Sequence, residues 1–295
     1  MKKTITLLKV VKLICRKSRK INKFSRSFES CNRFYSKSLI LEQRYFIELS
    51  YNGARFHGWQ VQPNARSVQG TLETTLSTLC RETIAVTGAG RTDAGVHADY
   101  FVAHIDSKNE NLDHPDFLRK LNRFLNADIA ILRISKVATE AHARFDAISR
   151  TYHYFIHQQK DPFLQETSWY YPIHLNIDEM NEACNALIGL HDFTSFSKLH
   201  TDVKTNFCHV FDASWLREES RLVFMIRANR FLRNMVRAIV GTMILVGKGK
   251  ITPEDFNQII ELGDRGLAGA SATPEGLFLT DIEYPVEVFR TKYRK

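Results

Sequence analysis

The chain has 295 residues and a formal net charge of +9. Residues 1–42 hold twelve Lys and Arg but only Glu29 and Glu42 as acids, a balance of +10, so the remaining residues sum to −1. A near-neutral remainder excludes a uniformly basic nucleic-acid-binding protein, and any RNA surface must be a local patch. At about 100–200 residues per domain, the length allows one or two domains.

Residues 1–42 are rich in Lys, Arg and Ser and nearly free of acids. This composition predicts a basic, disordered N-terminal extension that lies outside the fold. It is typical of a mitochondrial targeting segment, and a translation start near Leu39 or Leu41 is the alternative. Since no run approaches the ~20 apolar residues of a transmembrane helix, we expect no membrane span. The expected location is cytoplasmic, or mitochondrial if the segment is a genuine transit peptide.

Five cysteines are scattered along the chain without a Cys-x-x-Cys pair, which favours a reducing compartment over a disulfide framework. Cys208 and His209 could be combined with His191 and His200 as metal ligands. Their spacing matches no familiar zinc pattern, so we expect no metal site there.

The first half of the chain reads as strand, helix, strand, strand, helix, strand, which is the order of a ferredoxin-like split βαβ unit. Ser67 is the expected cap of the first helix, and Pro115 occupies a favoured first position of the second. The expected strands cover residues 44–49, 83–87, 100–105 and 129–137, and the expected helices cover residues 68–79 and 115–125.

The second half repeats this order. The expected strands cover residues 151–156, 207–216, 221–228 and 277–284, and the expected helices cover residues 177–188 and 230–246. An additional helix, with Thr252 as cap, Pro253 in its first turn and Gly263 at its end, follows the long one. The predicted fold class is therefore α+β, with ferredoxin-like halves over residues 43–147 and 148–295. We expect a largely antiparallel sheet and a central cleft between the halves.

The segment Gly88–His97, Gly-Ala-Gly-Arg-Thr-Asp-Ala-Gly-Val-His, is predicted to be a site-bearing loop between two strands. Its glycines match neither a dinucleotide fingerprint nor a P-loop. Asp93 beside an arginine suits a nucleophile or an electrostatic stabiliser better than a general acid. The plain alternative is that Asp93 only pairs with Arg91 and holds the turn.

Two further features can contact a nucleic acid. Asn229 is the expected cap of the helix over residues 230–246. Arg230, Arg233 and Arg237 are expected on one face of that helix, either as an ordinary solvated face or as a local basic patch for phosphates. Tyr152 and Tyr154 share one face of their predicted strand. They are either core residues or a stacking surface for an unpaired base.

A series of motifs resembles the TruA-type tRNA pseudouridine synthases. They are Tyr51-x-Gly53, Phe56-His-Gly-Trp-Gln60, Ser67-Val-Gln69, Gly90-Arg-Thr-Asp-Ala-Gly-Val-His97, His142-Ala-Arg-Phe145, Arg150-x-Tyr152-x-Tyr154, His191-Asp-Phe-Thr-Ser-Phe196, Phe231-Leu-Arg-Asn-Met-Val-Arg237 and Glu275-Gly-Leu277. They cover about residues 44 to 285.

The resemblance implies an isomerase that converts uridine to pseudouridine in the tRNA anticodon arm, at positions 38, 39 and 40. It implies that Asp93 is the catalytic carboxylate and that Tyr152 contacts the target base. Arg91 and Arg237 would help to position Asp93 and the RNA. A homodimer that binds tRNA, without metal or cofactor, is also implied.

Two rival classes are considered. A non-catalytic RNA-binding protein of the same fold would use the arginines and tyrosines but would not need Asp93, whose charge repels phosphate. A metal-dependent hydrolase would use Asp93 and His97 together with His191 and Asp192, and its activity would be sensitive to chelators.

Overall fold

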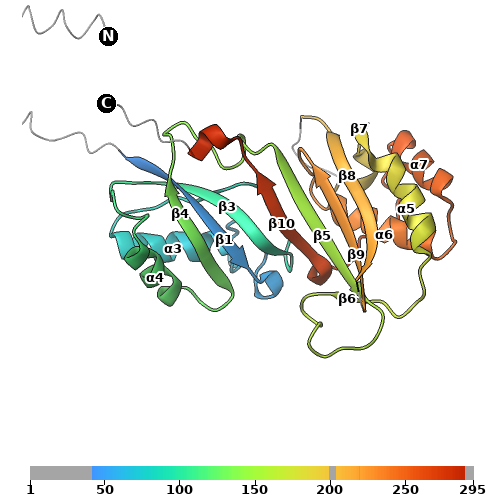
Figure 1. Ribbon diagram of the computed structural model, residues 1–295, viewed down its shortest axis with the longest axis horizontal. Helices are drawn as coiled ribbons and strands as arrows, with labels where there is room; N and C mark the ends of the chain where they lie inside the picture. Colours follow the sequence, from blue (N-terminus) through green and yellow to red (C-terminus); the bar gives the residue numbers. More distant parts are fainter. Residues whose placement is uncertain (1–41, 199–203, 219, 290–295) are drawn as a thin grey trace, which may run out of the picture. The chain divides into compact units, whose positions relative to one another are not determined.

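The computed structural model describes residues 42–198, 204–218 and 220–289. The predicted extension over residues 1–42 therefore lies outside the described residues, apart from Glu42. Ten strands form a single sheet in the described part of the chain. Along its main path the strand order is β4-β1-β3-β10-β5-β9-β8-β7 (Figure 1).

The first half supplies one side of the sheet. Its elements are β1 (Gln43–Tyr51), α3 (Val68–Cys80), β2 (Thr87–Gly88), β3 (His97–Ser107), α4 (Pro115–Phe124) and β4 (Ile129–Lys136). Ser67 caps α3 as predicted, since its side chain accepts from the Gly70 N–H, and the His114 side chain caps α4 by accepting from the Asp116 N–H. The strands pair in the ferredoxin-like order β4-β1-β3-β2.

The second half repeats the arrangement. Its strands are β5 (Ser149–His157), β6 (Trp169–Tyr170), β7 (Gly189–Asp192), β8 (Phe207–Glu218), β9 (Arg221–Ala228) and β10 (Leu277–Glu283). Its helices are α5 (Ile177–Cys184), α6 (Met235–Gly247) and α7 (Pro253–Leu262). The order β10-β5-β9-β8 is again ferredoxin-like, and a capping box between Thr252 and Asp255 begins α7 as predicted.

The halves join where β10 pairs with the start of β3. The pairing is parallel and short, with Phe278 opposite His97 and Leu279 opposite Ala98. Two separate hydrophobic clusters lie on either side of this junction, and Tyr152 packs against both of them. The junction therefore places the end of the Gly88–His97 loop next to strands of the second half.

The strand predicted over residues 83–87 is wrong except for its last residue. The Ile84 and Val86 N–H groups donate to the side chains of Ser77 and Glu73 on α3, so they do not pair with β3. Only Thr87–Gly88 forms β2. In the second half, the helix predicted to reach Ile188 ends at Cys184, and a 3-10 turn over Asn185–Leu187 leads into β7.

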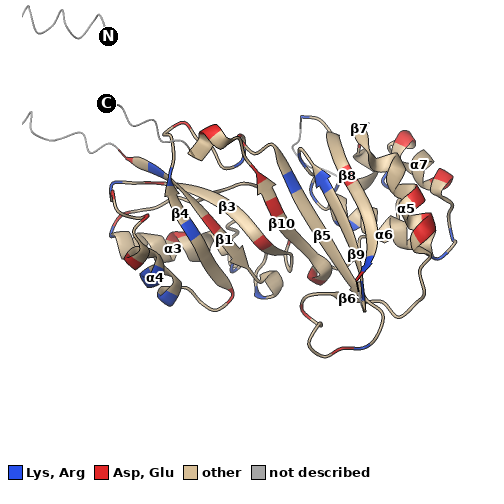
Figure 2. Cartoon of the chain, in the orientation of Figure 1, with Lys and Arg blue, Asp and Glu red and all other residues tan. Residues whose placement is uncertain are grey.

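The prediction of an α+β chain with a mostly antiparallel sheet and two ferredoxin-like strand orders is confirmed. None of the helices within residues 42–289 that the structure describes has the length and apolar character to cross a membrane. Figure 2 shows Lys and Arg as well as Asp and Glu on elements of both halves.

Candidate active site

The loop that carries Asp93 is held by the segment before α3. The Trp59 N–H donates to the Thr92 carbonyl over 3.2 Å, and the Gly95 N–H donates to the Phe56 carbonyl over 3.2 Å. Gly58 has a φ of +89°, and a Cβ atom on it would lie 2.4 Å from the Thr92 oxygen. Glycine is therefore required at position 58, because any side chain would displace the main chain next to Asp93.

Two arginines of the second half face the Asp93 carboxylate. Arg233 Nε lies 3.7 Å from Oδ1, and Arg237 Nη1 lies 3.6 Å from Oδ2. The side chain of Asp93 is 24% exposed, that of Arg237 is 19% exposed and that of Arg233 is 61% exposed. Two cations around one anion leave a local excess of positive charge, so the carboxylate need not repel a phosphate group.

The arginines do not share a helix face, so that prediction is wrong. α6 begins at Met235, not near Arg230, and only Arg237 lies on it. Asn229, which directly follows β9, does not cap the helix, because its side chain accepts from the main-chain N–H of His209 on β8. Arg230 and Arg233 belong to the connection that precedes α6.

The start of α6 is set by Asn234, which adopts a left-handed conformation with φ of 66°. Its side-chain amide donates to the Ser271 hydroxyl over 2.7 Å. Three residues along, the Arg237 side chain donates through Nε to the Ala272 carbonyl, and the Ala272 N–H donates back to the Arg237 carbonyl. These bonds to residues 271–272 orient the Arg237 guanidinium toward Asp93.

Tyr152 lies at the same site, on β5. Its ring packs edge-on against Phe231, with 5.1 Å between ring centroids. Burial raises the pKa of its hydroxyl to about 12, and the nearby Asp93 charge adds to the shift. The phenol is therefore protonated at neutral pH and can donate a hydrogen bond. Tyr154, in contrast, is fully buried and belongs to the core.

The remaining predicted arginines are placed differently. Arg91 is exposed and makes no ion pair with any residue that the structure describes. The alternative in which Asp93 pairs with Arg91 is thus not what the structure shows. Arg230 is half-buried and also makes no ion pair within the described ranges.

His97, the histidine at the end of the loop, is held by contacts inside the protein. His97 is buried, its ring stacks on Phe278, and its Nδ1 accepts from the Gly53 N–H over 3.1 Å. Burial lowers the pKa of His97. Over residues 42–198, 204–218 and 220–289, no three His, Cys, Asp or Glu side chains are grouped to hold a metal ion. The metal-dependent hydrolase therefore finds no site in this part of the chain, while His200 lies outside it.

Several residues that build this site belong to the motifs shared with the TruA-type synthases, but nothing in the sequence was a reason to assign them a role. They are Gly58, Phe231, Asn234 and Arg150. A glycine or asparagine in a left-handed turn leaves only a weak signal in one sequence. The bonds that join residues 234–237 to residues 271–272 span about 35 positions, and no periodicity reveals them.

Comparison with known proteins identifies the family of the chain. The family model for tRNA pseudouridine synthases matches residues 49–146 and 183–285, which include Asp93 and Arg237. The chain is 53% identical to tRNA pseudouridine synthase A of Parabacteroides distasonis over 84% of this chain and 98% of that protein. It is 51% identical to the protein of the same name from Bacteroides thetaiotaomicron, over 86% and 95% of the two chains. The corresponding protein of Bacteroides fragilis is 52% identical, over 84% and 98%.

Proposed function

We propose that this chain, which belongs to the tRNA pseudouridine synthase family, isomerises uridine to pseudouridine in tRNA. The resemblance points to positions 38, 39 and 40 of the anticodon stem-loop as the substrates. The observation that carries the proposal is the position of the Asp93 carboxylate. It lies between two arginines and beside Tyr152, on a loop that the motifs of the family supply.

The reaction breaks the bond between N1 of uracil and C1′ of the ribose and forms a bond between C5 and C1′. The C5 proton is lost and N1 ends protonated, so the atoms balance without a redox partner. One carboxylate can serve in such a reaction as nucleophile or as base. We assign this role to Asp93, and the guanidinium group of Arg237, which is the less exposed of its two arginine neighbours, keeps the carboxylate oriented.

The target uridine must leave the helical stack to reach a carboxylate in a protein site. We assign the contact with the extruded base to Tyr152. The ring is held edge-on by Phe231, and a protonated hydroxyl can donate to a base carbonyl. A base packed against Tyr152 would also exclude water from the cleaved intermediate.

We assign the roles of the four arginines from the exposure of their side chains and from their ion pairs. The half-buried Arg237, bonded to the Ala272 carbonyl, positions Asp93. The candidates for phosphate contacts are Arg233, Arg230 and Arg91. Arg91 and Arg230 make no ion pair with a carboxylate in the described ranges, and the Arg233 side chain is mostly exposed although it faces Asp93. These residues would line the central RNA-binding cleft.

The test uses a tRNA transcript labelled with tritium at uridine C5, without added metal. We expect the wild-type protein to release tritium and the Asp93→Asn variant to release none while it still binds tRNA. Release by the variant would contradict the role of Asp93. Tight binding without release by the wild type on several tRNAs would favour the second candidate, a non-catalytic RNA-binding protein. The Asp93 carboxylate argues against that candidate, because a protein that only binds RNA does not need a carboxylate facing two arginines that could contact phosphate themselves.

The homodimer and the cytoplasmic location are parts of the same proposal that follow from the resemblance. Light scattering of the purified protein, with and without one equivalent of tRNA, tests the oligomer. A dimer that binds one tRNA at a time is expected, and a monomer at all concentrations would contradict it.

A further inference from the structure

Arg150, at the start of β5, makes four hydrogen bonds to main-chain carbonyl groups. Nη1 donates to Ala147 over 3.0 Å and to Asn229 over 2.8 Å. Nη2 donates to Ala89 over 3.2 Å and to Arg144 over 2.6 Å. The guanidinium is half-buried and makes no ion pair with a carboxylate in the described part of the chain. Burial lowers the pKa of Arg150, as expected for a charge neutralised only by carbonyl dipoles.

The four carbonyl groups belong to three separate segments. Ala89 lies four residues before Asp93 in the loop, and its own N–H is fixed to the Val102 carbonyl of β3. Asn229 lies four residues before Arg233, and it bonds through main chain and side chain to His209. Arg144 and Ala147 belong to the connection between the two halves. Arg150 is thus bonded to both segments whose ends form the Asp93 site.

We propose that Arg150 is a positioning residue for the isomerisation, which sets the distance between the Asp93 loop and the segment that carries Arg233 and Arg237. This inference rests on the proposed function, and it identifies a residue on which the rate of the isomerisation depends. The residue acts through main-chain bonds and does not touch the reacting atoms. Its strand also carries Tyr152, so one side chain relates three parts of the site to one another.

Lysine cannot replace arginine here. A guanidinium presents two Nη groups in one plane, and each reaches two carbonyl groups at Arg150. An ammonium has three donors on a single nitrogen at the end of a flexible chain. Arg150→Lys therefore keeps the charge and loses the cross-link between the segments. Since a misplacement of about 1 Å can cost about 100-fold in rate, we expect a comparable loss in the single-turnover rate constant.

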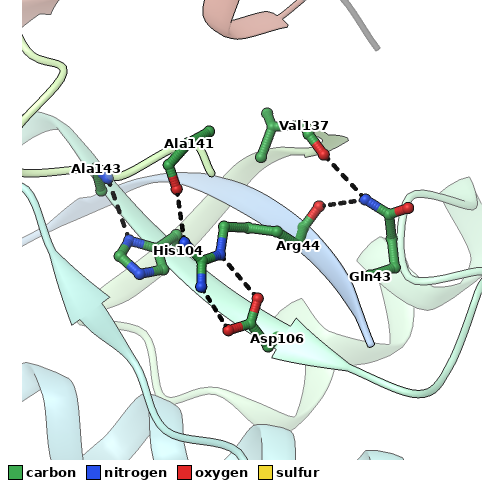
Figure 3. Close-up of polar contacts among 7 residues, drawn as sticks. All are labelled: Gln43, Arg44, His104, Asp106, Val137, Ala141 and Ala143. Atoms are coloured by element: carbon green, nitrogen blue, oxygen red, sulfur yellow. Dashed lines mark hydrogen bonds and ion pairs between the residues drawn. The ribbon is translucent and has the colours of Figure 1, made fainter. Parts of the chain in front are cut away.

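Arg44 provides a matched control. It is also half-buried, and it donates to the Asp106 carboxylate over 2.8 and 2.7 Å and to the Ala141 carbonyl over 3.0 Å (Figure 3). Arg44 pairs with Asp106 at the opposite end of β3 from His97, about 30 Å away along the strand. Arg44→Lys should lower thermal stability by a similar amount and leave the rate constant within about 2-fold of wild type.

The experiment measures the single-turnover rate constant of pseudouridine formation, the Kd for tRNA and the melting temperature. The proteins compared are wild type, Arg150→Lys, Arg150→Ala and Arg44→Lys. We expect both Arg150 variants to lose about 100-fold in rate with Kd changed less than about 3-fold. Guanidinium ion at millimolar concentration should restore part of the rate to Arg150→Ala only. A wild-type rate in Arg150→Lys, or an equal loss in Arg44→Lys, would overturn the inference.

A crystal structure of Arg150→Lys supplies a readout that does not depend on turnover. The distance between the Asp93 carboxylate and the Arg237 guanidinium, 3.6 Å here, should increase. An unchanged distance would overturn the inference. A wild-type protein that forms no pseudouridine would contradict the proposed function alone, and this structural comparison would still decide the role of Arg150.

Discussion

In the proposed function, the exposure of single side chains at this site distinguishes residues that position Asp93 from residues that bind RNA. The exposed fraction of the Arg237 side chain is 19%, and that of the Arg233 side chain is 61%, although both face Asp93. A half-buried guanidinium bonded to a carbonyl has little freedom to follow a phosphate. An exposed guanidinium can move away from the Asp93 carboxylate and contact a phosphate group when RNA binds.

We predict opposite effects for the two substitutions. Arg233→Ala should weaken tRNA binding and reduce the slope of log K against log salt concentration by about one. Arg237→Ala should leave that slope unchanged and lower the single-turnover rate by about 100-fold, because Asp93 loses its fixed partner. Binding titrations at several salt concentrations and rapid-quench rates separate the two roles. Equal slopes for Arg233→Ala and wild type would exclude a phosphate contact at Arg233.

Tyr152 allows a prediction about pH. Burial raises the pKa of its hydroxyl to about 12, so the phenol should stay protonated through the alkaline range in which the protein is folded. The rate of Tyr152→Phe should be reduced but should show the same dependence on pH between 7 and 10 as wild type. A change of rate with pH that is seen between pH 7 and 10 in the wild type and is absent from Tyr152→Phe would mean that the Tyr152 hydroxyl ionises in that range.

At the scale of elements, the loop and the start of α6 both depend on left-handed backbone. Gly58 supports the main chain of Thr92, and Asn234 turns the chain from the Arg233 segment into the helix. These positions decide where Asp93 and Arg237 lie, although neither residue contacts a substrate in the proposed reaction.

Gly58→Ala should therefore damage both stability and turnover. The new Cβ atom would lie 2.4 Å from a main-chain oxygen, and the backbone at φ of +89° disfavours any L side chain. We expect a loss of about 2 kcal/mol or more in the free energy of unfolding. Gly90→Ala is the control for stability, since a Cβ atom added there would meet no described atom within 4 Å. Urea denaturation of both variants checks the difference, and equal stabilities would contradict it.

Asn234 offers a second test of an element. Asn234→Ala leaves a residue in the left-handed region without the short polar side chain that lets Asn adopt it, and it removes the bond to Ser271, so it should cost about 1–2 kcal/mol. Asn234→Gly keeps the backbone conformation and should cost less. A higher melting temperature for Asn234→Ala than for Asn234→Gly would show that the backbone conformation at residue 234 does not determine the start of α6.

For the whole molecule, buried neutral histidines link stability to pH. His104 is 6% exposed, and its Nδ1 accepts from the Ala143 N–H (Figure 3). Burial, followed by the charge of Arg44, lowers its pKa to about 4 from 6.5. Between these values the unfolded chain binds a proton that the folded chain does not, so stability falls as the pH falls from 6.5 to 4.

The contribution of His104 to this loss should be about 3 kcal/mol at its limit. His104→Asn keeps an acceptor for the Ala143 N–H and cannot titrate, so its free energy of unfolding should vary less between pH 7 and 4. Urea denaturation at several pH values measures both slopes. A variant with the same slope as wild type would assign the acid sensitivity to other groups.

Removing residues 1–42 tests the predicted division of the whole chain. The segment carries a net charge of +10 in a chain of +9, so its loss should weaken tRNA binding at low salt. The rate constant at saturating protein should be unchanged, because every residue assigned to the site lies beyond position 42. A large loss in that rate constant would give the extension a role in catalysis.

The sequence alone determined the strand orders, most caps and the loop that bears Asp93. Hydrophobic periodicity and turn residues are local, and they suffice for elements such as α3, α7 and β9. They failed at β2, where side chains of α3 take the N–H groups of residues 84 and 86, and at Arg230, where Asn229 bonds to His209 instead of capping a helix.

The resemblance named Arg91 and Arg237 as the arginines near Asp93, and only the tertiary structure showed that Arg233, not Arg91, faces the carboxylate together with Arg237. The bonds that bring them together, from Arg237 to Ala272 and from Arg150 to Ala89 and Asn229, join residues 35 to 79 positions apart. Partners at such separations are chosen by the packing of strands and loops, which leaves no periodic pattern in the sequence. A motif can therefore identify the carboxylate, but its electrostatic surroundings depend on the folded chain.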